Sequence, residues 1–301
     1  MKTRALANLS VGAVLLAMPF AASCDIGLPN LDSLTSLFKS AKQAFVPATE
    51  EQEIAIGHDA AATLLGASKP IDDAAVQNYV NKVGLWIALQ SDRPGLPWHF
   101  AVVDSDDIDA FAAPGGFVFI TRGLLLHMHN EAELAGVLGH EITHVVLKHH
   151  LNALQRAAKL DLAGQAVQQG AAQEGYNSDL DNQLMDQVSG ASRTLYSKGL
   201  DKDDELDADR MGVVLAARAG YDPYGLMAVL QTLAALDPKS GSMQLLLATH
   251  PSPDDRIAAL SAAMTAGHMD KYGNQAEGQD RFEAVVKQLV AEVKKAPAKS
   301  K

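Results

Sequence analysis

The feature that most constrains this chain is the pair of histidines in His140-Glu141-Ile142-Thr143-His144. The apolar residues from Leu134 to Leu147 recur at helical spacing, and residues four apart on a helix lie on one face, about one turn apart. Both imidazoles can therefore reach one metal ion. Glu141 is rotated by about 100° around the helix and can project beside the ion, toward a bound water. The pattern predicts a catalytic metal site on a largely buried helix.

A second predicted helix offers the missing ligand. Glu205 and Asp209 are four residues apart on it. A catalytic zinc takes three protein ligands and keeps one position open for water, so Glu205 is a candidate third ligand. Asp209 can accept a hydrogen bond from the outer nitrogen of a ligand histidine. Asp207 competes as a ligand by spacing alone, and the whole acidic segment over 201–209 is equally compatible with a solvated face.

Two residues further along complete the candidate catalytic set. His250 and Arg256 lie in and after a polar, Pro-containing loop, and either could stabilise the oxyanion that forms when water adds to a carbonyl. A plain loop histidine is the alternative for His250. His149 and His150 do not share the face of both His140 and His144, so we expect them to have structural or supporting roles.

The N-terminus has the composition of a secretory signal peptide over residues 1–23. Lys2 and Arg4 precede an uncharged stretch that is short for a membrane-spanning helix, the alternative, and ends at small residues. Cys24, the only cysteine, follows Ala-Ala-Ser as in a lipobox, which predicts lipidation and a membrane anchor. Ordinary cleavage that leaves a free thiol is the alternative. No internal disulfide is possible, and the metal site must be built without thiolate.

The remaining pattern predicts an α+β fold that is mainly helical. A tether (24–48) precedes one domain (49–265), and a C-terminal helix with a basic tail (266–301) follows. Strands are expected at 98–103, 111–113 and 117–121, with a Pro-Gly-Gly turn at 114–116 that favours a hairpin and a small antiparallel sheet. Helices are expected from Thr49, over 72–89, over 130–196 with a break near 175–178, over 203–219, and from 223 to about 236. The net charge of −11 argues against a nucleic-acid partner.

Several separated motifs resemble the HtpX-like zinc metallopeptidases, the family that includes the CAAX prenyl proteases. The likeness covers about residues 50–262 and is closest in build to the LoiP/BepA-like periplasmic lipoprotein proteases. Besides the histidine motif, it rests on Glu51-Gln52-Glu53-Ile54, Leu96 to Phe100, Asp109 to Leu124, Glu205 to Gly212, and Ala219 to Pro223. Asp109 departs from the Asn that is common in this family, which would alter a hydrogen bond near the substrate strand.

The resemblance implies a zincin (gluzincin) domain that holds one Zn²⁺ per chain. His140, His144 and Glu205 correspond to the metal ligands, Glu141 to the catalytic base, and Asp209 to the partner of a ligand histidine. An edge strand facing the active-site cleft would pair with an extended substrate, and this role falls on Gly116, Phe117, Val118 and Phe119. His250 matches a histidine that either holds the enzyme latent or serves the transition state, and the sequence leaves both open.

The expected function is that of a zinc-dependent endopeptidase of the cell envelope, acting on extended or misfolded proteins. The expected location is the periplasm, at a membrane. Asp25 after Cys24 favours the inner membrane, while LoiP-like relatives favour the outer one. Alternatives are a lipid-anchored chaperone that keeps the zincin fold but hydrolyses little, and a purely structural zinc site. The structural site is the weaker alternative because such sites close with four ligands and often use cysteine.

Overall fold

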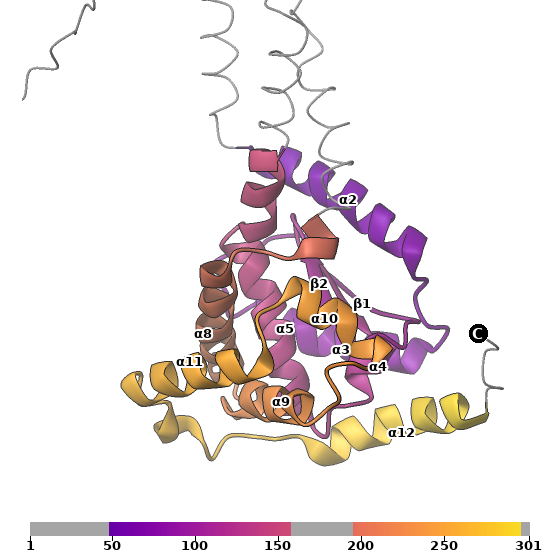
Figure 1. Ribbon diagram of the computed structural model, residues 1–301, viewed down its shortest axis with the longest axis vertical. Helices are drawn as coiled ribbons and strands as arrows, with labels where there is room; N and C mark the ends of the chain where they lie inside the picture. The colour runs from indigo at the N-terminus through magenta and orange to yellow at the C-terminus, as the bar shows by residue number, and fades with distance from the viewer. Residues whose placement is uncertain (1–47, 158–194, 296–301) are drawn as a thin grey trace, which may run out of the picture.

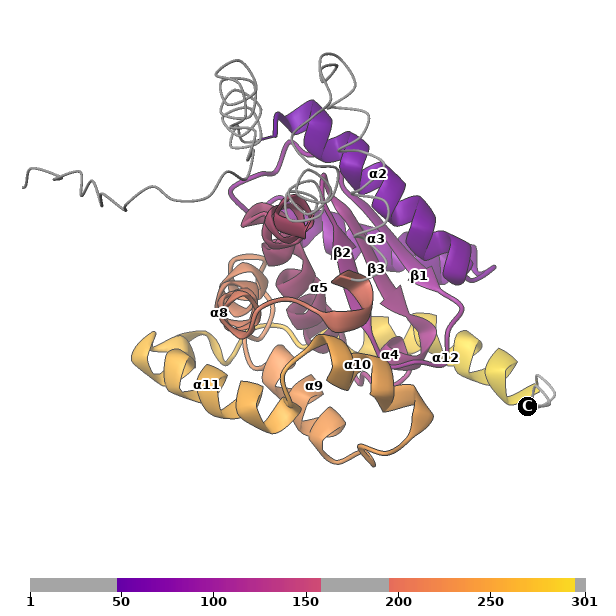
Figure 2. The same cartoon turned by 45° about the horizontal axis from the view of Figure 1, so that its top comes forward.

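The computed structural model describes residues 48–157 and 195–295. A small sheet lies among helices, with α5 and α8 side by side next to it (Figure 1, Figure 2). The elements are α2 (Glu50–Ala67), α3 (Ala74–Ala88), β1 (His99–Val103), β2 (Ala110–Ala113), β3 (Phe117–Thr121), α4 (Arg122–Leu125), α5 (Glu131–Val146), α8 (Lys202–Arg218), α9 (Gly225–Ala234), η1 (Gly241–Met243), α10 (Gln244–Thr249), α11 (Pro253–Ala266), η2 (Met269–Tyr272) and α12 (Gln279–Lys295).

The sheet has three strands in the order β1-β3-β2. β2 and β3 form the expected antiparallel hairpin around the turn at 114–116, but β1 runs parallel to β3. The predicted purely antiparallel sheet is therefore wrong: the sheet is mixed. The predicted edge position of Phe117–Thr121 is wrong too, because β3 is paired along both sides. Hairpin formation is a local property that the turn specifies, whereas the partner of β1 depends on the path of the chain through space.

The two faces of the sheet are both covered by helices. Val118 and Ile120 of β3 face the main core with α3 and α5, whereas Phe119 faces α2, where it packs with Ala60 and Ala61. This is the alternation with a period of two that a strand imposes. Thr49, where the sequence predicts the start of a helix, caps α2, and the side chains of Thr49 and Gln52 form a capping box.

Helices α5 and α8 approach each other unusually closely. A Cβ on Gly139 would lie 2.6 Å from the carbonyl oxygen of Gly212, and a Cβ on Gly212 would lie 2.6 Å from the backbone nitrogen of His140. Only glycine fits at such a backbone contact. The contact places His140 opposite Gly212 of α8, and on that helix Asp209 lies about one turn and Glu205 about two turns before Gly212.

Helix boundaries follow the sequence expectation except after the histidine motif. α5 ends at Val146, and Lys148 adopts a left-handed conformation (φ 60°) before the chain resumes as a helix over 149–157. The expected uninterrupted helix is therefore broken there. The predicted signal peptide (1–23), Cys24, the tether up to 47, the break near 175–178 and the end of the basic tail (296–301) lie outside the described residues.

The C-terminal helix α12 belongs to the same core as the rest of the fold. Phe282, Val286 and Leu289 are buried in it, and Arg281 binds Glu131 of α5 at 2.6 Å. In Figure 2 it lies beneath the sheet and α3. Over the ranges that the structure describes, no helix combines the length and the apolar character that crossing a bilayer requires.

Candidate metal and catalytic site

Helices α5 and α8 bring His140, His144 and Glu205 together at one point. The Nε2 atoms of the two histidines are 3.0 Å apart, and each lies 3.6 Å from a carboxylate oxygen of Glu205. Two nitrogens bound tetrahedrally to one zinc would be about 3.3 Å apart, given bonds of about 2.0–2.1 Å. All three side chains are buried, with exposures of 1–2%. The spacing of the three donors fits a single shared cation.

The chemistry of these donors also fits a metal ion. Glu205 Oε2 is fully buried and has no hydrogen-bond partner among the described residues, which is costly for a carboxylate unless a cation binds it. Burial opposes ionisation of Glu205, but His250 and His140 lower its pKa to about 2, so it is charged at neutral pH. Asp207, the competing ligand from the sequence, faces solvent and pairs with Arg210 instead. The structure therefore brings Glu205, and not Asp207, to the histidines.

The outer nitrogen of His140 is held by an ion pair. His140 Nδ1 lies 2.8 Å from Asp209 Oδ1, as the sequence predicts, and Arg256 binds both oxygens of Asp209 at 2.5 and 3.0 Å. All three residues are buried. Desolvation favours a neutral Asp209, but Arg256 and His140 hold its pKa far below the usual range. Arg256 thus contacts the side of His140 opposite to Nε2, and its role in stabilising an oxyanion stays a prediction.

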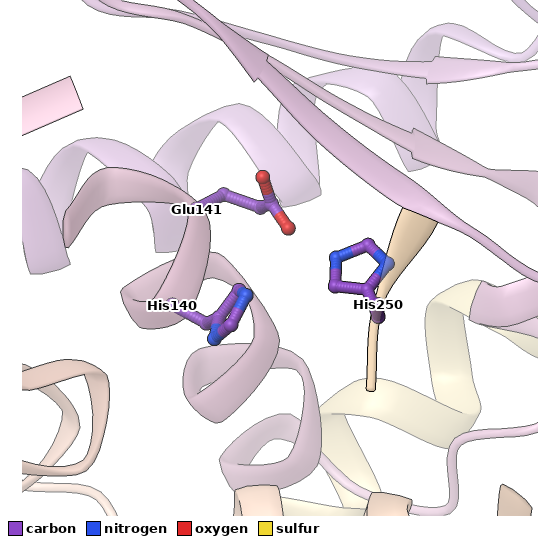
Figure 3. A group of neighbouring side chains, drawn as sticks. All are labelled: His140, Glu141 and His250. Atoms are coloured by element: carbon purple, nitrogen blue, oxygen red, sulfur yellow. The ribbon is translucent and has the colours of Figure 1, made fainter. Parts of the chain in front are cut away.

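Glu141 lies beside the three donors, as the helical spacing predicts. Figure 3 shows that Glu141 and His140 project from neighbouring positions of α5, and that His250 reaches in from the opposite side. The Glu141 side chain is buried, and this burial raises its pKa to about 7. A carboxylate with a pKa near neutrality is well suited to accept a proton and return it.

His250 points its Nε2 into the same space. That atom is 3.6 Å from Glu205 Oε2, the same distance as His140 Nε2, while Nδ1 contacts Thr249 Oγ1 at 2.9 Å. His250 together with His140 and Glu141 forms a second, overlapping group of possible metal donors. Burial lowers the pKa of His250 to about 4, against the opposing effect of Glu205, so the imidazole is neutral and has a lone pair available.

Strand β2 lies at the edge of the sheet next to this group. Thr121 of β3 donates its backbone N–H to the carbonyl of Asp109, the residue before β2, so the backbone polar groups of Ala110 and Ala112 point away from β3. Within the described ranges, no strand pairs with this edge. The hydroxyl of Tyr196 donates to the carbonyl of Ala112 at 2.9 Å. Local sequence patterns do not predict this role of Tyr196, because nothing local connects it to a strand 84 residues away.

Asp109 stands where asparagine is common in the family, and in this structure it differs less from asparagine than a charged carboxylate would. Its carboxyl is buried, and desolvation together with the nearby Glu141 raises its pKa well above the ordinary value. A protonated carboxyl has a donor group beside an acceptor oxygen, as the amide of asparagine does, although the amide has two N–H donors and the carboxyl a single O–H. Asp109 lies close to the site: its Oδ1 is 3.8 Å from His250 Nδ1.

A pocket opens beside Glu141 and His250. Apart from the polar residues of the site, its walls are apolar, from α4, α5, α9, α10 and the start of β2: Leu124, Val137, Leu226, Val229, Leu230, Leu233, Leu246 and Ala110. Val137 lies one turn before His140 on α5, which places this wall next to the metal donors.

Two histidines from one helix, a glutamate from a second helix and a free glutamate beside them define a metallopeptidase domain of the zincin type. Comparison with known proteins agrees with this class. The model of peptidase family M48 matches residues 74–264, and the chain belongs to this family.

Three relatives illustrate the likeness. The chain is 29% identical to the "Beta-barrel assembly-enhancing protease" of Yersinia pestis over 256 residues, which are 82% of this chain and 51% of the relative. It is 32% identical to "Metalloprotease YcaL" of Escherichia coli over 181 residues, 60% of this chain and 67% of the relative. It is 28% identical to "Mitochondrial metalloendopeptidase OMA1" of Arabidopsis thaliana over 217 residues, which are 71% of this chain and 42% of the relative. The chain thus spans about half the length of the first of these relatives.

Proposed function

We propose that this protein is a zinc-dependent endopeptidase of the cell envelope that hydrolyses extended or misfolded polypeptides. The observation that carries the proposal is the convergence of His140, His144 and Glu205, with the buried carboxylate of Glu141 beside them. Two nitrogens and one carboxylate oxygen, with no thiolate, are a donor set typical of catalytic zinc. Membership of family M48 supports the same activity.

His140, His144 and Glu205 would hold the metal. When bound, zinc supplies a Lewis acid that polarises the scissile carbonyl and lowers the pKa of its water to about 7. Glu141 accepts the proton of the attacking water on its carboxylate and delivers it to the leaving amine. Asp209 and Arg256 keep the His140 ring oriented, with the proton on Nδ1 and the lone pair on Nε2.

The substrate backbone would pair with β2. This assignment replaces the expected pairing with Gly116–Phe119, since β3 has no free side, whereas Ala110 and Ala112 point their backbone groups outward, where no strand of the described residues pairs with them. An added strand would donate an N–H to the Ala112 carbonyl, which the Tyr196 hydroxyl contacts here. Tyr196 must therefore release that carbonyl when an extended substrate binds. The apolar pocket next to Val137 and Glu141 suits an aliphatic side chain of the substrate.

We further propose that His250 holds the enzyme latent. Its neutral Nε2 is at the same distance from Glu205 Oε2 as that of a ligand histidine, so it can take the position that water needs. Alternatively, His250 stabilises the transition state. Removing the imidazole would then lower the activity, whereas removing a blocking imidazole would raise it.

For the cellular setting, a relative named for enhancing β-barrel assembly favours the bacterial envelope. Cys24 would carry the lipid that anchors the protein at a periplasmic membrane surface. Unfolded envelope proteins would be the substrates, because backbone pairing along β2 requires an extended chain and depends little on the identity of the substrate side chains.

Cleavage of unfolded casein by zinc-loaded protein tests the proposal. Glu141→Gln keeps the size of the side chain and removes the base, so it should retain zinc and lose hydrolysis by at least about 100-fold. A metal-free sample should be inactive and recover when zinc is added. Equal cleavage by the wild type and Glu141→Gln would overturn the assignment of the base. A wild type that binds unfolded casein without cutting it would instead indicate a chaperone.

A further inference from the structure

We propose that His149 is a positioning residue for the metal ligand His144. The two rings meet through their Nδ1 atoms at 2.9 Å, and both residues are buried. This inference rests on the metal site of the proposed function, but it concerns metal binding alone and can be tested without hydrolysis.

The geometry fixes which ring donates. His144 Nε2 faces His140 and Glu205, so it must keep its lone pair for the metal. The proton of the neutral ring then sits on Nδ1 and is donated to His149 Nδ1. His149 in turn carries its proton on Nε2, which points toward Asp204 at 3.7 Å. Each ring thus has one defined tautomer, and a chain of contacts runs from the metal position to the start of α8.

The backbone is bent so as to make this contact. On an uninterrupted helix, a residue five positions after His144 would lie about 140° away around the axis. Instead, Lys148 adopts a left-handed conformation that a non-glycine residue takes only at a cost in free energy. Lys148 is held in it by an ion pair to Glu53 at 3.0 Å, and Glu53 is itself buried. The turn brings the His149 ring back against His144.

The two ligand histidines therefore have different outer partners. His140 donates to a carboxylate that Arg256 fixes, whereas His144 donates to a neutral imidazole. His150 touches the same ring, at 5.2 Å between centroids, but makes no hydrogen bond to it. Its ring stacks on Tyr196 instead. His150 therefore serves as a matched control for His149.

The test compares His149→Asn with His149→Leu. The two side chains have the same shape, but asparagine places an acceptor oxygen where histidine has Nδ1, and leucine places a methyl group there. The zinc dissociation constant would be measured by competition with a chromophoric chelator. We expect His149→Leu to weaken zinc binding 10–100-fold and His149→Asn to restore it to within a few-fold of the wild type. His150→Leu should leave the zinc dissociation constant unchanged.

Thermal unfolding of the metal-free proteins separates positioning from folding, because the isosteric pair should unfold at similar temperatures while differing in zinc affinity. If His149→Leu binds zinc as tightly as the wild type, or if the Asn and Leu variants are equally weakened, the inference is overturned. A wild type without affinity for zinc would instead refute the proposed function. Should both His149 variants fail to fold, Asp204→Asn, at a more exposed position, should still weaken zinc binding, and an unchanged constant would overturn the inference.

Discussion

The contact between α5 and α8 can be tested by adding a single methyl group. In Gly212→Ala, the new Cβ would lie 2.6 Å from the backbone nitrogen of His140, whereas ordinary contacts begin at about 3.4 Å. The helices would have to separate by about 0.8 Å, because the clash is with backbone that cannot rotate away. Metal–ligand distances vary by only about 0.2 Å around their typical values. A separation of the helices by about 0.8 Å would therefore move Glu205 too far from an ion that the histidines hold.

The expected magnitudes follow from two opposing effects. Overpacking costs about 1–3 kcal/mol, and replacing a helical glycine by alanine returns about 1 kcal/mol. Urea unfolding of metal-free Gly212→Ala should therefore give a free energy of unfolding up to about 2 kcal/mol below the wild type, with zinc binding at least 10-fold weaker. Gly66→Ala is the control, since nothing lies within 4 Å of its Cβ on α2. It should gain up to about 1 kcal/mol and bind zinc normally. If Gly212→Ala behaved like Gly66→Ala, the argument from the helix contact would be refuted.

Three further predictions concern the site itself. Burial raises the pKa of Glu141 from 4.5 to about 7, so the folded metal-free protein holds this proton more tightly than the unfolded chain does. As the pH rises from 4.5 to 7, ionisation of Glu141 therefore lowers the free energy of unfolding, by about 3 kcal/mol at most. In urea unfolding, the free energy of unfolding of Glu141→Gln should not fall in this way between pH 4.5 and 7. If it depended on pH in the same way for the wild type and the variant, the prediction would be contradicted. His250→Ala should raise kcat/KM on casein several-fold if the imidazole blocks the water position, whereas a loss of activity would assign it to the transition state. Tyr196→Phe should lower KM for extended peptides a few-fold because the Ala112 carbonyl becomes free, and an unchanged KM would mean that β2 is not the substrate strand.

The sequence predicted those parts of the site that depend on one helix at a time. The pairing of His140 with His144 and that of Glu205 with Asp209 follow from helical spacing, whereas the start of α2 at Thr49 and the turn at 114–116 follow from local capping and turn residues. Asp207 could have been set aside by the same spacing: Glu205, Ala208, Asp209 and Gly212 form the buried face of α8, and Asp207 points away from it.

The remaining features depend on contacts between distant segments. The parallel pairing of β1 with β3 and the contact of Tyr196 with β2 arise from the path of the chain, which local spacing does not record. The orientation of Arg256 toward Asp209 is of the same kind. His149 is different, since it is adjacent to the motif. The sequence predicts a supporting role for it, but the contact of His149 with His144 could not be predicted, because lysine rarely adopts the left-handed conformation that turns the chain at Lys148.

The proposed metal site depends most on Glu205 as the third ligand, and two variants of the same helix test this directly. Glu205→Ala and Asp207→Ala would each be loaded with zinc, dialysed against a weak chelator and analysed for metal content per chain. We predict that the wild type and Asp207→Ala keep one zinc ion per chain and that Glu205→Ala loses it. Full retention of zinc by Glu205→Ala, or its loss from Asp207→Ala alone, would contradict the proposed site.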